Sequence, residues 1–133
     1  MTILVYILSV LLMILVPVVL AALLRRRFVV PWFLFCVGIL TFTASQAVHL
    51  PFNAWLADLG VLPHADQQVT SPLWQVALVA GLTAGVCEEL ARVVGYAFLR
   101  RYRSFEGGLM MGLGHGGFEA MVFGGIGTAA GVS

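Results

Sequence analysis

The run ILVYILSVLLMILVPVVLAALL occupies Ile3–Leu24 and contains no charged side chain. Three arginines, Arg25, Arg26 and Arg27, follow it directly. A helix of about 20 apolar residues is long enough to span the hydrocarbon core of a bilayer. The run has no basic segment before it, and it is longer than the apolar region of a secretory signal. It therefore predicts a first transmembrane helix rather than a cleaved signal peptide.

The composition of the 133-residue chain extends this prediction to the whole protein. Hydrophobic residues make up 61% of the chain, charged residues only 10%, and the mean hydropathy is +1.02. A soluble domain lacks the polar side chains to cover so much apolar surface. We therefore expect an all-α, multi-pass protein of the cell membrane. Its length suits a single integral membrane domain (1–133), a bundle of about four transmembrane helices.

The positions of the other helices follow from the remaining apolar segments. Beside the first helix over about 3–24, we expect helices over about 31–50, 73–99 and 107–128. Pro51 favours a break after the second helix. The more polar stretch 52–70 is interpreted as an interfacial loop with room for a short amphipathic helix.

The seven basic residues, all of them arginine, indicate how the chain is oriented. Two arginine clusters, 25–27 and 100–103, follow the first and third predicted helices. Because basic residues stay on the cytoplasmic side, both clusters are expected there, with the N-terminus and the 52–70 loop outside. No basic stripe or aromatic platform suggests nucleic acid as a partner.

Glycines recur at four-residue steps on the third and fourth predicted helices. Gly81 and Gly85 lie on one helix, and Gly108, Gly112 and Gly116 lie on the other. Small residues at this spacing let transmembrane helices approach closely. We therefore expect the third and fourth helices to pack against each other through these glycine faces.

Polar residues share these glycine-bearing faces, because residues three or four apart lie on one side of a helix. They are Glu88, Glu89, Arg92 and Tyr96 on the third helix, and His115 and Glu119 on the fourth. On the second helix, Gln46 and His49 share a face with Asn53 if the helix extends that far.

The depths of these residues in the membrane also match. Counting ~1.5 Å per residue from the turn between the third and fourth helices, Arg92 and His115 lie at about 12–13 Å. On the same count, Glu88 and Glu119 lie at about 18 Å. The side chains are therefore expected to meet in one site near the middle of the membrane.

The charges of this site leave several chemistries open. Three carboxylates against Arg92 alone leave two excess negative charges in a low dielectric. Either one or two carboxylates stay protonated, or His115 is charged, or a divalent metal such as zinc binds. The first two suit acid/base catalysis, whereas the third gives metal-assisted chemistry with Glu88, His115 and Glu119 as candidate ligands. A Glu–Arg pair can also act only as a contact between helices, but five ionisable groups at one depth favour a catalytic centre or an ion pathway.

Three motifs carry a resemblance to a known family. They are EELAR (Glu88–Arg92), GLGHGGFEAM (Gly112–Met121) and SQAVHLPFN (Ser45–Asn53). Together they resemble the YhfC-type family of glutamic intramembrane proteases, a distant relative of the CAAX prenyl protease and bacteriocin-processing superfamily and of the PrsW proteases. The resemblance covers nearly the whole chain but only the front part of the family pattern. It implies either a shortened chain or a homo-oligomer in which a second copy completes the site.

The resemblance also implies a role for each matching residue. Glu88, or failing that Glu89, would activate a water to attack a peptide carbonyl, and Arg92 would orient or balance the pair. His115 and Glu119 would polarise the carbonyl, hold the water or carry a proton.

Access of water and substrate is a separate expectation. We assign it to Gln46, His49 and Tyr96, the first two at the polar outer end of the second helix.

The leading hypothesis is therefore an intramembrane peptidase that hydrolyses a peptide bond of a membrane protein or lipidated peptide. Its partners would be that substrate and the membrane lipids. The alternatives are a non-enzymatic module that binds or transports a ligand through the polar cavity, and an inactive, shortened protease homologue. Ion flux coupled to Glu88 would indicate transport, whereas new protein termini would indicate proteolysis.

Overall fold

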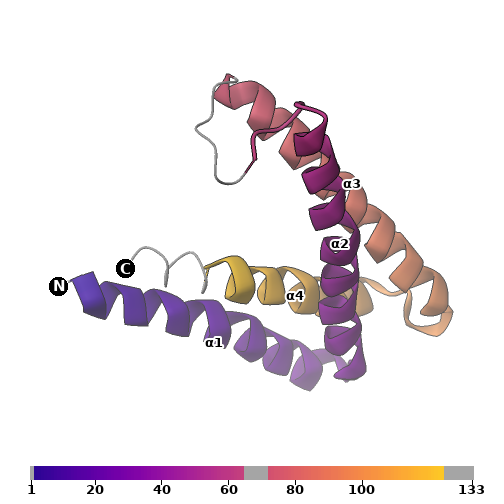
Figure 1. The fold of residues 1–133 in the computed structure, drawn as a ribbon. Coiled ribbons are helices and arrows are strands. Elements are labelled where there is room, and N and C mark those ends of the chain that lie inside the picture. Colours follow the sequence, from indigo (N-terminus) through magenta and orange to yellow (C-terminus); the bar gives the residue numbers. More distant parts are fainter. Residues whose placement is uncertain (1, 65–71, 125–133) are drawn as a thin grey trace.

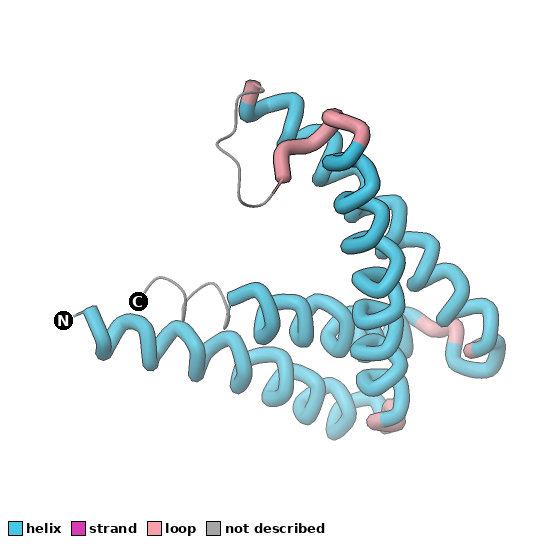
Figure 2. Tube along the Cα trace, viewed as in Figure 1, coloured by secondary structure: helices cyan, strands magenta, loops and turns pink. Residues whose placement is uncertain are grey.

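The protein is helical throughout the part of the chain that the computed structural model describes, residues 2–64 and 72–124 (Figure 2). The four α-helices are α1 (Thr2–Phe28), α2 (Phe33–Asp58), α3 (Leu73–Phe98) and α4 (Phe105–Glu119). A 3₁₀ turn, η1 (Arg100–Tyr102), links α3 to α4, and a π-helical turn, η2 (Ala120–Gly124), continues α4. The predicted all-α class is confirmed for these residues.

Two of the described helices are long and apolar enough to cross a membrane, Leu4–Phe28 and Phe33–Asp58. Only 11% of the apolar window of the first is buried within the protein. A core helix of a soluble protein would be largely buried, so α1 has the exposed apolar surface expected of a lipid-facing helix. Among the described residues, α3 and α4 do not meet the same criterion, and an arrangement of four spans stays a prediction.

The second helix is longer than the sequence predicts. It continues through Pro51 to Asp58. The predicted break after residue 50 is therefore wrong, and so is the predicted loop over residues 52–58. Proline removes one helical hydrogen bond, but contacts with α3 hold this end of α2. Thr83 Oγ1 on α3 donates a hydrogen bond to Asn53 Oδ1 at 3.0 Å and lies 3.3 Å from His49 Nε2.

The other helix boundaries lie close to the predicted ones. α1 runs four residues further than expected and carries the three arginines of the first cluster in its last turn. α3 ends one residue earlier than expected, and α4 begins two residues earlier, with Ser104 Oγ accepting a hydrogen bond from Gly107 N as its N-cap. The end of the predicted fourth helix (125–128) and residues 65–70 of the predicted loop lie outside the described residues.

The arrangement of the helices differs from the predicted one. α2 packs against both α3 and α4, and α1 packs against α4. Figure 1 shows α1 and α4 side by side, with α2 crossing α4 and then running along α3. The expected packing of α3 on α4 through glycines is wrong for four of the five positions. Apart from neighbouring residues of the same helix, no described atom lies within 4 Å of a Cβ built on Gly81, Gly85, Gly112 or Gly116.

Other glycines make the closest helix contact. A Cβ on Gly38 of α2 would overlap Met111 O of α4 and lie 2.7 Å from His115 N. A Cβ on Gly114 of α4 would in turn overlap Phe35 O of α2. The backbones of α2 and α4 therefore touch at this crossing, which only residues without a side chain permit.

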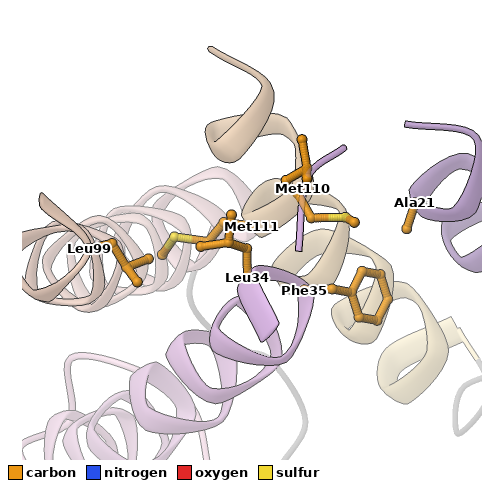
Figure 3. Close-up of a cluster of buried hydrophobic side chains, with 7 residues drawn as sticks. Ala21, Leu34, Phe35, Leu99, Met110 and Met111 are labelled. Atoms are coloured by element: carbon orange, nitrogen blue, oxygen red, sulfur yellow. The ribbon is translucent and has the colours of Figure 1, made fainter. Parts of the chain in front are cut away.

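A hydrophobic core fixes the start of α4 beside this crossing (Figure 3). Its buried members come from α1, α2, α4 and the connecting turns: Ala21, Val30, Leu34, Phe35, Leu99, Met110 and Met111. Met111 lies one helical turn before His115, so the packing of this core also sets the direction of the His115 side chain.

Candidate metal centre

Three side chains from two helices meet beside the crossing of α2 and α4. Glu88 projects from α3, and His115 and Glu119 project from one face of α4, four residues apart. Each offers one ligand atom, and the three atoms lie within 4.8 Å of one another. The sequence predicts this convergence, although α3 and α4 do not pack directly along these faces.

His115 is the most enclosed member of this group, with 1% of its surface exposed. Its Nδ1 lies 3.0 Å from Thr41 Oγ1, and the Phe42 ring meets the imidazole edge-on with the ring centroids 5.5 Å apart. The other ring nitrogen, Nε2, is buried, has no hydrogen-bond partner within residues 2–64 and 72–124, and lies 3.7 Å from Glu88 Oε2. A buried polar atom left without a partner costs free energy, so it calls for a ligand such as an ion or a water.

Arg92 joins both adjacent glutamates. One of its terminal nitrogens donates a hydrogen bond to Glu89 Oε1 at 2.8 Å and lies 3.9 Å from Glu88 Oε2. The side chain of Glu89 is 69% exposed, whereas that of Glu88 is 16% exposed. Glu89 therefore forms the close ion pair with Arg92, and Glu88 turns inward to His115.

This pairing leaves a defined charge at the convergence point. Arg92 offsets only one of the three carboxylates that it lies among, so the formal excess of two negative charges expected from the sequence remains in this group. A divalent cation matches that charge. Carboxylate oxygens and a neutral imidazole nitrogen are also established zinc ligands. The chemistry of the donor set and the unpartnered His115 Nε2 therefore both fit a divalent metal.

The spacing of the donor atoms fits as well. Two ligands of one tetrahedral zinc ion lie about 3.5 Å apart, given metal–ligand bonds of roughly 2.0–2.2 Å. The limit of 4.8 Å between the donor atoms here is somewhat wider. If the three residues bound zinc, three protein ligands would be the number found in catalytic rather than structural zinc sites.

The three residues assigned to access lie elsewhere. His49 Nε2 lies 2.9 Å from Asn53 Nδ2, and His49 Nδ1 lies 3.4 Å from Gln46 Oε1, in the polar network that joins α2 to α3. The Tyr96 hydroxyl lies against Gly108, close to the turn that precedes α4. Their predicted role in access of water or substrate stays a prediction.

One residue in contact with the site was not predicted from the sequence. Thr41 is 6% exposed, and its hydroxyl is the hydrogen-bond partner of His115 Nδ1. Its only sequence signal is a hydroxyl-bearing residue inside an apolar helix, one turn before Ser45. That signal is weak, because threonine often bonds only to its own helix.

Comparison with known families places this geometry in context. A family model described as YhfC intramembrane metalloprotease matches residues 12–132. The chain belongs to this family. The match contains every residue of the candidate centre, and the resemblance inferred from the EELAR and GLGHGGFEAM motifs is confirmed. No curated protein and no solved structure matches the chain significantly.

Membership of the YhfC family narrows the chemistry left open by the sequence. The family is described as one of intramembrane metalloproteases, whereas the motifs alone suggested a glutamic protease. Of the three ways to remove the excess negative charge, the binding of a divalent metal is the one that agrees with this description. The group of Glu88, His115 and Glu119 supplies residues that could hold it.

Proposed function

We propose that this chain is a membrane-embedded metallopeptidase that holds a divalent metal such as zinc through Glu88, His115 and Glu119. The observation that carries the proposal is His115 Nε2, a buried nitrogen without a hydrogen-bond partner among the described residues, which lies near the carboxylates of Glu88 and Glu119. The substrate is a peptide bond of a membrane protein or a lipidated peptide. When bound, the metal would lower the pKa of a water ligand and polarise the peptide carbonyl.

A residue beside the proposed ligands carries out the proton transfer. Glu88 is the base favoured from the sequence, but as a ligand it cannot also take up a proton freely. Glu89 is the adjacent carboxylate outside the ligand set. It accepts the proton that the attacking water loses and returns it to the leaving amine nitrogen as the C–N bond breaks.

Arg92 has two functions in this scheme. Its hydrogen bond to Glu89 holds that carboxylate beside Glu88. Its Nε is a second buried atom without a hydrogen-bond partner among the described residues. This N–H is available to the carbonyl oxygen of the peptide, which becomes more negative as water adds.

The proposed setting is the cell membrane, with the N-terminus outside and the arginine clusters 25–27 and 100–103 in the cytoplasm. A contact between the start of α2, which follows the first cluster, and the second cluster itself supports one orientation for both. The Phe33 ring at the start of α2 meets the Tyr102 ring edge-on, with centroids 4.8 Å apart. Membrane lipids surround the exposed apolar helices, and a second copy of the chain remains a proposed partner for the open faces of α3 and α4.

A comparison of membranes tests the peptidase proposal. Membranes containing the wild type, Glu88→Gln or Asp58→Asn are compared by mass spectrometry of new protein N-termini, and the purified proteins by their metal content. Asp58 is an exposed carboxylate at the end of α2 and serves as the matched control. The proposal predicts bound metal and new termini with the wild type and Asp58→Asn, and neither with Glu88→Gln.

Two other results would favour the alternative functions. Metal bound without new termini would favour an inactive homologue or a binding module. The absence of both from well-folded wild type would remove the peptidase proposal.

A further inference from the structure

We infer that Thr41 is a positioning residue that fixes the tautomer of His115, so that Nδ1 carries the proton and Nε2 presents a lone pair. The tautomer follows from hydrogen bonds alone. Its consequence for metal binding rests on the function proposed above.

The direction of each hydrogen bond decides the tautomer. Thr41 Oγ1 lies 2.8 Å from Gly38 O and 3.0 Å from His115 Nδ1. A carbonyl oxygen can only accept, and Gly38 O is the nearer of the two neighbours, so we assign the single hydroxyl proton of Thr41 to the bond with Gly38 O. The hydroxyl oxygen then has only lone pairs to offer His115. Nδ1 must therefore donate, which leaves Nε2 unprotonated in the neutral ring.

The surroundings hold this arrangement in place. Thr41 and His115 are both buried, so water does not compete for their hydrogen bonds. Gly38 provides the carbonyl that takes the hydroxyl proton, and its missing side chain lets α2 touch the α4 backbone at His115 N. The same close crossing thus sets both the direction and the length of the bond between Thr41 and His115.

The other tautomer would disable the candidate centre. A proton on Nε2 would lie on the side of Glu88 Oε2, 3.7 Å away, and a small rotation of that carboxylate would bring the two atoms within hydrogen-bond distance. That bond would occupy both the imidazole nitrogen and a carboxylate oxygen that a metal needs. Metal-bound histidines generally donate their second N–H to an oxygen nearby, and loss of that partner weakens metal binding about 10–100-fold.

Two substitutions separate positioning from simple packing. Thr41→Val keeps the shape and removes the hydroxyl, whereas Thr41→Ser keeps the hydroxyl. The matched control is Thr43→Val on the same helix, because the Thr43 hydroxyl donates to the Ile39 carbonyl but is exposed and does not contact His115.

Nitrogen-15 NMR of histidine-labelled full-length chain in micelles reads the tautomer directly, without metal. The His115 signal is identified by its loss in His115→Gln. We expect the Nδ1–H tautomer in the wild type, Thr41→Ser and Thr43→Val, and a shift to Nε2–H in Thr41→Val. An Nε2–H tautomer in the wild type, or an unchanged tautomer in a helical, folded Thr41→Val, overturns the inference.

Titration with Co²⁺ alone, followed by its visible absorption, tests the consequence. Affinity should fall about 10–100-fold in Thr41→Val and stay near the wild-type value in Thr41→Ser and Thr43→Val. Equal affinity in Thr41→Val overturns the link from the tautomer to the metal. If the wild type shows the Nδ1–H tautomer but binds no Co²⁺, the proposed metal centre fails while the assignment of the tautomer to Thr41 stands.

Discussion

Replacing Gly38 by alanine should push α2 and α4 apart at their crossing, beside which the candidate centre lies. A Cβ at this position would lie 2.7 Å from His115 N and overlap Met111 O. Ordinary contact needs about 3.4 Å, so α4 must retreat by at least about 0.7 Å. Neither obstacle is a flexible side chain that can swing aside, because both atoms belong to the α4 backbone.

A second variant isolates the loss of unfolding free energy that this overlap causes. Overpacking of this kind costs roughly 1–3 kcal/mol, while alanine gains up to about 1 kcal/mol over glycine in a helix interior. Gly85→Ala on α3 has the same helical gain but meets no described atom within 4 Å. The difference in unfolding free energy between the two variants cancels the helical gain and should be about 1–3 kcal/mol, with Gly38→Ala the less stable.

Unfolding by SDS in mixed micelles, followed by circular dichroism, measures this difference. Co²⁺ affinity measured on the same samples should fall only in Gly38→Ala, because the retreat of α4 carries His115 away from Thr41. Equal stability of the two variants would refute the described crossing of α2 and α4. A less stable Gly85→Ala would instead support direct packing of α3 on α4.

Three further outcomes are expected. At a free zinc concentration 100 times the dissociation constant, bound metal should stabilise the wild type by about 2.7 kcal/mol. A chelator should reverse the rise in melting temperature, and Glu119→Gln should show no rise; a normal rise in that variant would remove Glu119 from the ligand set. Thr83→Val loses the bonds that tie α3 to the outer end of α2 and should lower the unfolding free energy by about 0.5–1.5 kcal/mol in the SDS titration, so wild-type stability would contradict that role. In a background without the native cysteines, a membrane-impermeant thiol reagent should label His64→Cys from outside and Phe105→Cys only after the membrane is opened; the reverse pattern would invert the proposed topology.

The location of the centre could be predicted because charge inside an apolar helix is costly and therefore informative. Counting residues from one turn brings Glu88 of α3 to the level of Glu119 on α4, about one helical turn from His115, and the structure brings these three together. Counting residues cannot tell which of the two adjacent glutamates, Glu88 or Glu89, faces the site. The difference between an inward Glu88 and an exposed Glu89 depends on how α3 is rotated about its axis, which α2 determines.

The partners of the glycine faces could not be predicted, because four-residue spacing identifies a small face without showing what lies opposite. Gly108, Gly112 and Gly116 form the more regular pattern, yet the close contact is made by Gly38 and Gly114. Gly38 is a single glycine in the second predicted helix, where no spacing marks it. Gly38 makes the close contact because the crossing of α2 over α4 brings it against the α4 backbone.

Pro51 illustrates a local preference that tertiary contacts override. The residue before a proline is biased away from helix, and this bias alone predicts a break after residue 50. The bonds of Thr83 to Asn53 and its contact with His49 hold the next two turns of α2 against α3. These partners lie some thirty residues apart in the chain, beyond the reach of any local signal.

Gly85, Gly112 and Gly116 do not pack α3 on α4, so their positions near the candidate ligands call for another explanation. Gly85 lies one turn before Glu88, and Gly112 and Gly116 lie one turn before His115 and Glu119. Gly112 and Gly116 are exposed and line an apolar groove between α1 and α4. An apolar groove of about 470 Å³ lies between α2 and α3, and Thr41 forms part of its wall. Because the Thr41 hydroxyl is already hydrogen-bonded to Gly38 and His115, it is not free to bind a peptide in that groove. For the substrate proposed above, we therefore expect the main chain to approach the proposed centre along the groove between α1 and α4, where the exposed glycines leave room for a backbone.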